Sequence, residues 1–526
     1  MPDSQINFGE TLPEDFGGSA LTKIIATLGP ASAGVVTIRK LIEAGVSVFR
    51  LNLSHGDLET HAQRVQEVRK AASDLGRPIG ILADLPGPKI RVGKLPETGV
   101  ELHIGQTVVI GTSAEVSPVT QSPEAAALTC TYSGLPGDVN EGHRVLINDG
   151  AVRLLAVSRT DDKLTCVVKQ GGLVTTGKGI NLPDSHLRIE ALTSHDFECV
   201  EWAVKNDLDF IAMSFVRSAD EIRVLNEELR RLHAKYGCAG AMRPIIAKIE
   251  LPQAVANIES ITAAADALMV ARGDLGVEMD LPRVPAIQKK LLKIADEYGK
   301  PCIVATQMLE SMISAASPTR AEVSDVANAI LDGADALMLS AETSIGKYPV
   351  VTVEYVRRVA QYTERYLASL SAGASPPKKL IESRHRTAAL AHGAWTIARD
   401  VDARFIVVWS QLGGGARYLS QTRFTIPILA ITSDERVARQ MQLYWSVTPV
   451  RMPLPDDLDH LTTLIDHYLI ATEWAHEGDA CIIMAGQPLG RPASTNRIAV
   501  HYLGNPETGF HEPTRSPSES GPPSVW

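Results

Sequence analysis

The stretch "ALMVARGDLGVE" (267–278) joins a short apolar run to a charged turn that contains two glycines. Its first five residues are apolar and have the length of a buried strand, whereas Arg272 and Asp274 are charged. A buried charge is costly unless it is paired or bound to a metal. Charges placed directly after a buried strand therefore indicate a site at the end of that strand.

Similar apolar runs recur along the chain and alternate with helical patterns. The other runs are "TKIIATLG" (22–29), "SVFRLNL" (47–53), "IGILADL" (79–85), "DFIAMSF" (209–215), "PIIAKIE" (244–250), "PCIVATQM" (301–308) and "ALMLSAE" (336–342). The helical stripes include Ile222, Leu225, Leu229 and Leu232, and then Val323, Val326, Ala327 and Ile330, which Gly333 follows as a C-cap. Eight strand-like runs alternating with helices predict a (β/α)8 barrel over residues 21–87 and 184–370.

The alternation is interrupted once, after the third strand. Residues 88–183 change to a pattern of alternating apolar and polar residues, with an Asp149-Gly150 hairpin signal. We interpret this segment as an all-β domain, itself a small β-barrel, inserted into the larger barrel. Such a domain is placed to act as a lid over the barrel mouth.

A second α/β pattern follows the linker-like sequence "SLSAGASPPKK" (369–379). Its expected strands are "ARFIVVWS" (403–410), "IPILAITSD" (426–434) and "DACIIMAG" (479–486), which predict an open-sheet α/β domain over residues 380–505. Residues 1–20 form a separate N-terminal segment. Residues 506–526 are rich in Pro, Ser and Gly and predict a disordered tail.

Length and composition restrict the class of protein. A chain of 526 residues suggests about three domains. The net charge of −10 argues against a nucleic-acid partner. The six cysteines are scattered, which favours reduced thiols. The N-terminus lacks the apolar core of a signal peptide, and no apolar run approaches the roughly 20 residues that span a membrane. We therefore expect a cytoplasmic protein.

Polar side chains gather at the predicted strand ends, where barrel enzymes place their active sites. These residues are Arg50, Asn52, Ser54, His55, Lys248, Glu250, Arg272, Gly273, Asp274, Thr306, Ser340 and Glu342. The spacing of Arg50, Asn52 and Ser54 puts all three on one face of a strand, and the same holds for Lys248 and Glu250. Taken alone, each residue has an ordinary structural explanation. Their convergence on one face of the barrel is the stronger signal.

The carboxylates of Glu250 and Asp274 follow neighbouring strands. Two such groups suit Mg²⁺ or Mn²⁺, and the alternative is that Lys248 and Arg272 neutralise them as ion pairs. The turn that begins at Gly273 frees backbone N–H groups, which bind carboxylate or phosphate oxygens. A divalent metal, an anionic substrate and a lid indicate phosphoryl transfer or enolate chemistry, without choosing between the two.

At this point the sequence resembles the pyruvate kinase family over residues 22–503. The matching segments are "TKIIATLGPAS", "FRLNLSHGD", "GPKIRVG", "KGINLPD", "AKIELPQAV", "MVARGDLGVE", "ATQMLESM", "PTRAEVSDVANAILDGADALMLSAET" and "GKYP". The resemblance implies the same three-domain organisation. It also implies transfer of the phosphoryl group of phosphoenolpyruvate to ADP, giving pyruvate and ATP in the last step of glycolysis.

The resemblance implies a role for each site residue. Glu250 and Asp274 match the ligands of the Mg²⁺ that bridges the substrate, Lys248 matches the lysine that stabilises charge on the transferring phosphoryl group, and Arg50 matches a phosphate-binding arginine. The remaining matches fall into three groups. The substrate carboxylate is held by the amides of Gly273 and Asp274 and by the Thr306 hydroxyl. Protonation of the enolate involves Thr306 and Ser340. The nucleotide is contacted by His55, Asn52, Arg91 and Lys178.

The segment "DLPGPKIR" (84–91) departs from the family pattern. Many members read Asp-Thr-Lys-Gly-Pro-Glu there and require K⁺. The ligands of that monovalent-cation site match Asn52, Ser54, Asp84 and Leu85, where Leu85 replaces the usual Thr. Lys89 replaces the usual Glu, and its ammonium group can supply the charge that K⁺ brings. We therefore expect that K⁺ is not required; the alternative is that Lys89 only pairs with a nearby acid.

The C-terminal loop "SQLGGGARYLS" (410–420) keeps only Ser410 of the early hydroxyl residues of sugar-phosphate-activated members. This predicts weak or absent activation by fructose-1,6-bisphosphate. The resemblance further suggests an allosteric homotetramer.

Two other functions compete with the kinase. A metal-dependent lyase acting on pyruvate enolate needs the two carboxylates but not Lys178 and Arg91. A non-catalytic sensor of phosphoenolpyruvate would not need Lys248, Glu250 and Asp274, all of which are present.

Overall fold

The computed structural model describes residues 20–112, 125–238, 240–370, 377–423, 426–491 and 494–510. The predicted N-terminal segment, apart from Ala20, lies outside the described residues. The same holds for most of the predicted linker and for the predicted tail beyond residue 510.

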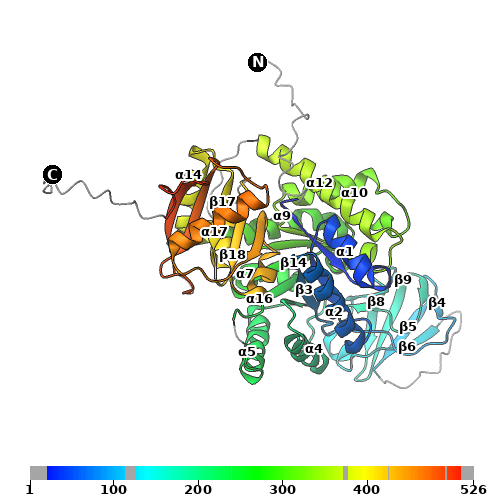
Figure 1. Ribbon diagram of the computed structural model, residues 1–526. Coiled ribbons are helices and arrows are strands. Elements are labelled where there is room, and N and C mark those ends of the chain that lie inside the picture. Colours follow the sequence, from blue (N-terminus) through cyan, green and yellow to red (C-terminus); the bar gives the residue numbers. More distant parts are fainter. Residues whose placement is uncertain are drawn as a thin grey trace, which may run out of the picture.

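Eight parallel strands close into a barrel at the centre of the molecule (Figure 1). They run in the order β1-β16-β15-β14-β13-β12-β3-β2. Their bounds are β1 Lys23–Thr27, β2 Val46–Asn52, β3 Gly80–Asp84, β12 Phe210–Met213, β13 Ile245–Ile249, β14 Ala267–Ala271, β15 Cys302–Ala305 and β16 Ala336–Leu339. Every residue of these strands except three in β2 is buried, because a parallel barrel covers both faces of its sheet. The predicted (β/α)8 barrel is confirmed.

Helices surround the barrel and connect its strands. They are α1 Val35–Ala44, α2 Leu58–Asp74, α4 Ser194–Lys205, α5 Ala219–Lys235, α6 Pro252–Ala256, α7 Ile258–Ala264, α8 Arg272–Glu278, α9 Val284–Tyr298, α10 Arg320–Leu331, α11 Ala341–Ser344 and α12 Pro349–Ser369. Short 3-10 turns lie at Pro30–Ser32, Leu281–Arg283 and Glu310–Ile313. The predicted stripe of α5 is completely buried against the barrel.

A β domain is inserted between β3 and β12. It contains a six-stranded sheet of order β11-β7-β8-β9-β5-β6 and a two-stranded sheet of β10 and β4. The bounds are β4 Val100–Leu102, β5 Thr107–Gly111, β6 Ala125–Thr129, α3 Leu135–Asp138, β7 Arg144–Ile147, β8 Val152–Arg159, β9 Lys163–Gln170, β10 Gly172–Val174 and β11 Ile180–Asn181. The predicted hairpin joins β7 to β8, and Asn148, Asp149 and Gly150 all have positive φ there. We call this domain the lid.

The C-terminal domain packs on the opposite side of the barrel from the lid (Figure 1). Its elements are α13 Lys378–Glu382, α14 Arg386–Asp400, β17 Phe405–Trp409, α15 Gly414–Ser420, β18 Ile428–Thr432, α16 Glu435–Met441, β19 Val447–Arg451, α17 Leu458–Ala471, β20 Ala480–Gly486 and β21 Thr495–Tyr502. The sheet has the order β19-β18-β17-β20-β21, with β21 antiparallel. The three predicted strands are present, and β19 and β21 were not predicted.

Two sequence expectations can be compared directly with the structure. All six cysteines are described and are free thiols, as predicted. In the described part of the chain, no helix combines the length and the apolar character that crossing a membrane requires.

Candidate active site

Lys248 stands at the centre of a charged cluster inside the barrel mouth. It lies near the end of β13, and its Nζ is 2.9 Å from Oε1 of Glu250 and 3.1 Å from Oδ1 of Asp84. The ammonium group also donates to the hydroxyl of Ser214 at 2.7 Å. Lys248 is only 9% exposed, so a water-poor site holds one cation between two carboxylates.

The neighbours of Lys248 determine its charge. Burial lowers the pKa of this ammonium group, but the carboxylates of Asp84 and Glu250 outweigh burial and raise the pKa above its ordinary value. Burial also works to raise the pKa of Asp84, but Lys248 and Arg50 together hold it below the ordinary value. Lys248 is therefore a cation, and Asp84 an anion, throughout the neutral pH range.

Arg50 shares the Asp84 carboxylate with Lys248. The register of β2 and β3 places Arg50 beside this strand end, and its Nε donates to Oδ2 of Asp84 at 2.6 Å. Its Nη1 donates to the hydroxyl of Thr27 at 3.1 Å. Asp84 thus holds two cations in fixed positions, which suits recognition of a doubly charged anion such as a phosphoryl group.

Glu250 and Asp274 follow the adjacent strands β13 and β14, as predicted. Oε2 of Glu250 accepts from the backbone N–H of Phe215 at 2.7 Å. Burial raises the pKa of Glu250, Lys248 opposes this, and the negative charge of Asp274 adds to it. The Asp274 carboxylate forms no hydrogen bond or ion pair with any described residue. The ion pairing given as the alternative to a metal is therefore seen for Glu250 but not for Asp274, since Arg272 pairs with Asp325 at 2.7 Å instead.

The carboxylates fit a divalent metal of the magnesium type. No group of three or more His, Cys, Asp or Glu side chains in the described residues is arranged to hold a metal. Mg²⁺ suits such a sparse site, because it keeps several waters and binds one or two carboxylates together with substrate oxygens. The open Asp274 carboxylate beside the constrained Glu250 matches that requirement.

Gly273 and Thr306 meet across the ends of β14 and β15. The backbone N–H of Gly273 donates to Oγ1 of Thr306 at 2.8 Å, and this hydroxyl donates to the carbonyl of Ala305 at 2.6 Å. Asp274 lies in the first turn of α8. The structure therefore brings the predicted carboxylate-binding amides and the Thr306 hydroxyl together.

Ser340 lies directly after β16, as predicted, and precedes α11. Its backbone N–H donates to Oε2 of Glu342 at 2.7 Å, and Oε1 of Glu342 accepts from the N–H of Leu309 at 3.2 Å. Glu342 is buried and ties the loops after β15 and β16 together. Its observed contacts are structural.

The residues predicted to contact a nucleotide are spread over the barrel rim and the lid. Asn52 ends β2, and His55 is exposed on the loop that follows. Arg91 lies at the start of the lid, where its Nη1 donates to the carbonyl of Gly177 at 3.0 Å. Lys178 directly follows Gly177 in the lid and is exposed.

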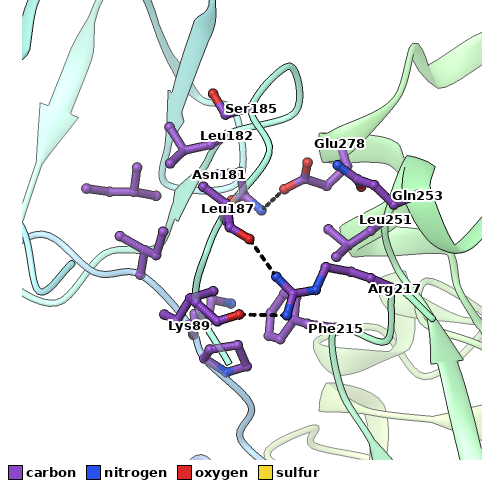
Figure 2. A pocket seen from close by; sticks show the side chains of 14 residues that line it. Lys89, Asn181, Leu182, Ser185, Leu187, Phe215, Arg217, Leu251, Gln253 and Glu278 are labelled. Atoms are coloured by element: carbon purple, nitrogen blue, oxygen red, sulfur yellow. Dashed lines mark hydrogen bonds between the residues drawn. The ribbon is translucent and has the colours of Figure 1, made fainter. Parts of the chain in front are cut away.

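A small cleft lies at the junction of the lid and the barrel, and residues of both domains line it (Figure 2). Asn181 of β11 donates to Oε1 of Glu278 at 2.7 Å, across the junction. Burial, with the negative charges of Asp274 and Glu250, raises the pKa of Glu278 to about 7. Glu278 ends α8, the short helix that begins at Arg272 and contains Asp274. One helix therefore carries both a site carboxylate and the contact with the lid.

The predicted monovalent-cation residues are occupied by internal contacts. The Asn52 side chain accepts from the N–H of Ser54 at 3.3 Å, and the Leu85 carbonyl accepts from the hydroxyl of Ser214 at 2.7 Å. Asp84 pairs with Arg50 and Lys248, as described above. Lys89 lines the cleft between lid and barrel (Figure 2) and forms no ion pair with a described residue.

Ser214 and Phe215 are site residues that the sequence interpretation missed. Ser214 binds Lys248 and the Leu85 carbonyl, and Phe215 holds Glu250 through its backbone N–H. The position of Ser214 just after the apolar core of β12 was a usable signal. No sequence signal could have indicated the contact of Phe215, because its backbone N–H makes the hydrogen bond and every residue type except proline has this group.

Fold and site together define a (β/α)8-barrel enzyme with a fixed cationic centre and two metal-compatible carboxylates. Comparisons with known proteins agree with that class. A model described as "Pyruvate kinase, barrel domain" matches residues 20–353, and one described as "Pyruvate kinase, alpha/beta domain" matches residues 388–501.

Individual relatives match nearly the whole chain. A pyruvate kinase of Corynebacterium efficiens is 41% identical over 483 residues, which cover 92% of this chain and 98% of the relative. One of Mycobacterium tuberculosis is 40% identical over 482 residues, with the same coverage of 92% and 98%. The solved structure of a pyruvate kinase from Cryptosporidium parvum has a TM-score of 0.82 at 31% identity and covers 94% of this chain and 98% of its own. The chain belongs to the pyruvate kinase family and is a phosphotransferase.

Proposed function

We propose that this protein transfers the phosphoryl group of phosphoenolpyruvate to ADP and releases pyruvate and ATP. The observation that carries the proposal is the position of Lys248, held between Asp84 and Glu250 at the barrel mouth beside the open carboxylate of Asp274. This arrangement supplies fixed positive charge where a phosphoryl group passes between two oxygens.

Lys248 and Arg50 are proposed to bind the transferring phosphoryl group. Both side chains are already oriented by Asp84, so little reorganisation is needed when the substrate binds. Since phosphoryl transfer needs little covalent help from the protein, fixed positive charge is the main contribution expected of these residues.

Glu250 and Asp274 are proposed to hold Mg²⁺ or Mn²⁺. When bound, the metal supplies a further positive charge to the phosphoryl and enolate oxygens. The contact of Glu250 with the Phe215 N–H orients one ligand in advance. A second divalent ion is expected to arrive with the nucleotide.

The other end of the substrate is assigned to Gly273, Asp274 and Thr306. We propose that the two backbone amides and the Thr306 hydroxyl bind its carboxylate. The loss of the phosphoryl group leaves an enolate, whose methylene carbon must gain a proton to give pyruvate. Thr306 and Ser340 are the proposed groups for this proton transfer, and solvent replaces the proton that they give.

The nucleotide is proposed to lie between the barrel rim and the lid. Asn52 and His55 come from the rim, and Arg91 and Lys178 come from the lid. Closure of the lid would bring these cations to the phosphates and exclude water, which otherwise competes with ADP for the phosphoryl group.

The reaction is tested by incubating the full chain with phosphoenolpyruvate, ADP and Mg²⁺ and following both products by ³¹P and ¹H NMR. We expect equal amounts of ATP and pyruvate, and no product when EDTA removes the metal. Pyruvate and inorganic phosphate without ATP would indicate a phosphatase, and no product from folded protein would favour the lyase or the sensor. Binding of phosphoenolpyruvate without any product would favour a sensor.

We also propose that the enzyme does not require K⁺, because Lys89 supplies the charge. The absence of an ion pair between Lys89 and any described residue supports this over simple pairing with an acid. Rates in K⁺ and in tetramethylammonium at equal ionic strength should agree within about 2-fold, whereas a K⁺ effect of about 100-fold, or roughly 2.7 kcal/mol, would contradict the proposal.

The Lys89→Glu variant makes the K⁺ proposal sharper. We predict that it becomes K⁺-dependent, with a loss of about 10- to 100-fold in K⁺-free buffer that added K⁺ reverses. Lys94→Glu, a lid variant close in sequence, is the matched control and should respond equally to both cations. A K⁺-insensitive loss in Lys89→Glu would assign Lys89 a structural role.

The remaining assignments follow from family membership. We propose a cytoplasmic homotetramer whose partners are small molecules and not nucleic acid or membrane. The glycine-rich loop before and within α15 predicts weak or absent activation by fructose-1,6-bisphosphate. Light scattering of the purified chain and a titration with that sugar phosphate test these two points.

A further inference from the structure

The turn after β15 has an unusual backbone. Thr306 and Gln307 have φ values of 69° and 55°, in the left-handed region. This region is uncommon for residues other than glycine, and a β-branched residue such as Thr306 is a clear outlier there. Such a conformation persists only when surrounding contacts hold it in place.

Arg272 provides those contacts from the neighbouring strand end. Its Nη2 donates to the carbonyl of Thr306 at 2.8 Å, to the carbonyl of Gln307 at 3.2 Å and to Sδ of Met308 at 3.0 Å. One charged nitrogen therefore binds three successive residues of the strained turn. The rigid, planar guanidinium group suits this, because its donors are fixed relative to one another.

The other end of the guanidinium group is anchored to α10. Nη1 of Arg272 lies 2.7 Å from Oδ2 of Asp325 and donates to Oδ1 at 2.9 Å. The Arg272 side chain is only 10% exposed, whereas that of Asp325 is 39% exposed, so the guanidinium group is shielded from water although its partner is not. Asp325 fixes the direction in which Arg272 reaches the turn.

The residue after Arg272 holds the side chain of Thr306. The Gly273 N–H donates to Oγ1 of Thr306 at 2.8 Å, while the Arg272 side chain binds the carbonyl of the same residue. Residues 272 and 273 thus hold Thr306 at two points, and the contact of Arg272 is the one that persists when the Gly273 N–H binds the substrate carboxylate as proposed above.

We propose that Arg272, anchored by Asp325, is a positioning residue that orients the Thr306 hydroxyl for proton transfer to the enolate. The inference rests on the proposed function, which gives Thr306 its role. Arg272 does not touch the substrate in this scheme, and it acts by holding the backbone of residues 306 and 307. In the protonation step the enolate carbon gains a C–H bond, the O–H bond breaks, and solvent restores the proton.

The test compares Arg272→Gln and Asp325→Asn with the parent chain. Arg283→Gln is the matched control, because Arg283 is an exposed arginine in the 3-10 turn that follows α8, the helix that begins at Arg272. We expect Arg272→Gln to lower kcat by about 10- to 100-fold, since small misplacements of catalytic groups have effects of this size. Asp325→Asn should lower kcat by a smaller factor, and KM for ADP should stay within about 2-fold in both.

Two further readouts separate positioning from a general structural role. Exchange of the methyl hydrogens of pyruvate with deuterium from solvent reports the proton-transfer step alone, and it should slow by a factor similar to kcat. In the Thr306→Val background, Arg272→Gln should lower kcat by less than about 3-fold, because residues that act through one another are not additive. Thermal melts show whether each variant is folded.

The possible results decide between clear alternatives. The inference is overturned if Arg272→Gln and Asp325→Asn behave like Arg283→Gln, or if the loss from Arg272→Gln is the same with and without the Thr306 hydroxyl. If Arg272→Gln does not fold, Asp325→Asn decides by the same criteria. Failure of the proposed function looks different, since the parent chain would then not form pyruvate together with ATP.

Discussion

At the scale of single residues, the site depends on charges that neighbours hold in one state. Asp84 binds both Arg50 and Lys248, and Glu250 gives Lys248 a second anionic partner. These contacts outweigh the effect of burial on Lys248 and raise its pKa. The same contacts make the site vulnerable to the loss of any one charge, because the partners stay buried.

The first prediction concerns Lys248 itself. Lys248→Met keeps most of the side-chain volume but removes the charge that faces the phosphoryl group. We expect kcat to fall by about 10²- to 10³-fold, the usual loss for one preorganised electrostatic contact. Lys205→Met is the control, because Lys205 pairs with Glu201 on the exposed surface of α4. A Lys248→Met enzyme with more than a tenth of the parent rate would contradict the assignment.

The second prediction concerns Glu278, whose pKa is raised to about 7 mainly by burial. A raised carboxyl pKa means that the folded protein binds a proton between pH 4.5 and 7 that the unfolded chain has released. The protonated Glu278 carboxyl therefore contributes to the free energy of unfolding in full below pH 4.5, and this contribution is lost as pH rises through 7. Glu278→Gln mimics the protonated form and still offers Asn181 an acceptor.

Thermal melts in EDTA measure this effect. At pH 8 the Glu278→Gln variant should be more stable than the parent by on the order of 1–3 kcal/mol, and the difference should shrink as pH falls towards 5. Glu227→Gln, on an exposed position of α5, should show no such trend. An advantage that stays constant from pH 5 to 8 would show that Glu278 does not titrate in this range.

At the scale of elements, the loops after the barrel strands are held by side chains at helix starts. Thr319 caps α10 by accepting from the N–H of Glu322, and the Glu322 carboxylate accepts from the N–H and the hydroxyl of Thr319. The same carboxylate accepts from the N–H and hydroxyl of Ser311, in the 3-10 turn after β15. One capping box thus fastens α10, which carries Asp325, to the segment that follows Thr306.

The third prediction tests that capping box. Thr319→Ala should lower the free energy of unfolding by about 1 kcal/mol, as usual for the loss of an N-cap. The neighbouring Arg320→Ala, at an exposed position, serves as the control and should lie within about 0.5 kcal/mol of the parent. Calorimetry measures both, and equal stabilities of the two variants would mean that the cap contributes nothing.

The sequence was a good guide to some elements and a poor guide to others, for physical reasons. The barrel strands were recognisable because burial on both faces makes them continuous apolar runs. β19 contains Pro449 and lies at the sheet edge, and β21 begins with three polar residues, so neither gives that signal. The domain after the linker was therefore predicted with only part of its sheet.

The site was predicted at the level of residue types but not of partners. Polar residues at strand ends marked Lys248, Glu250, Asp274 and Thr306, because few other reasons place such residues there. Pairing could not be derived, since the partners come from separate elements. Pairing of Arg272 with a site carboxylate was the alternative to a metal site, and the structure pairs Arg272 with Asp325 instead, 53 residues later.

At the scale of the whole molecule, an ion network fastens the C-terminal domain to the barrel. Arg439 of α16 binds Asp209 at 2.7 Å and Asp207 at 2.6 Å, both of which precede β12. Asp209 is fully buried and also pairs with Arg69 of α2 at 2.9 Å. The lid, by contrast, meets helix α8 of the barrel through a single side-chain amide among the described residues, since Asn181 donates to Glu278.

The fourth prediction follows from this network. Arg439→Met leaves the buried Asp209 with one cation fewer, which should destabilise the protein by about 3–5 kcal/mol. Arg451→Met is the matched control, because among the described residues the Arg451 side chain pairs with Glu435 alone, in an exposed pair of a type worth about 0–1 kcal/mol. Calorimetry should show the C-terminal domain melting earlier in Arg439→Met, and equal melting of the two variants would contradict this role of the network.

The most direct test of the central claim is the initial rate of pyruvate formation from phosphoenolpyruvate and ADP. The assay uses the full chain with Mg²⁺, and tetramethylammonium is the only monovalent cation. The arrangement of Lys248, Glu250 and Asp274 predicts turnover of about 1–10³ s⁻¹, lost on addition of EDTA. If folded protein forms no pyruvate in this buffer or after addition of K⁺, then this site does not transfer a phosphoryl group from phosphoenolpyruvate.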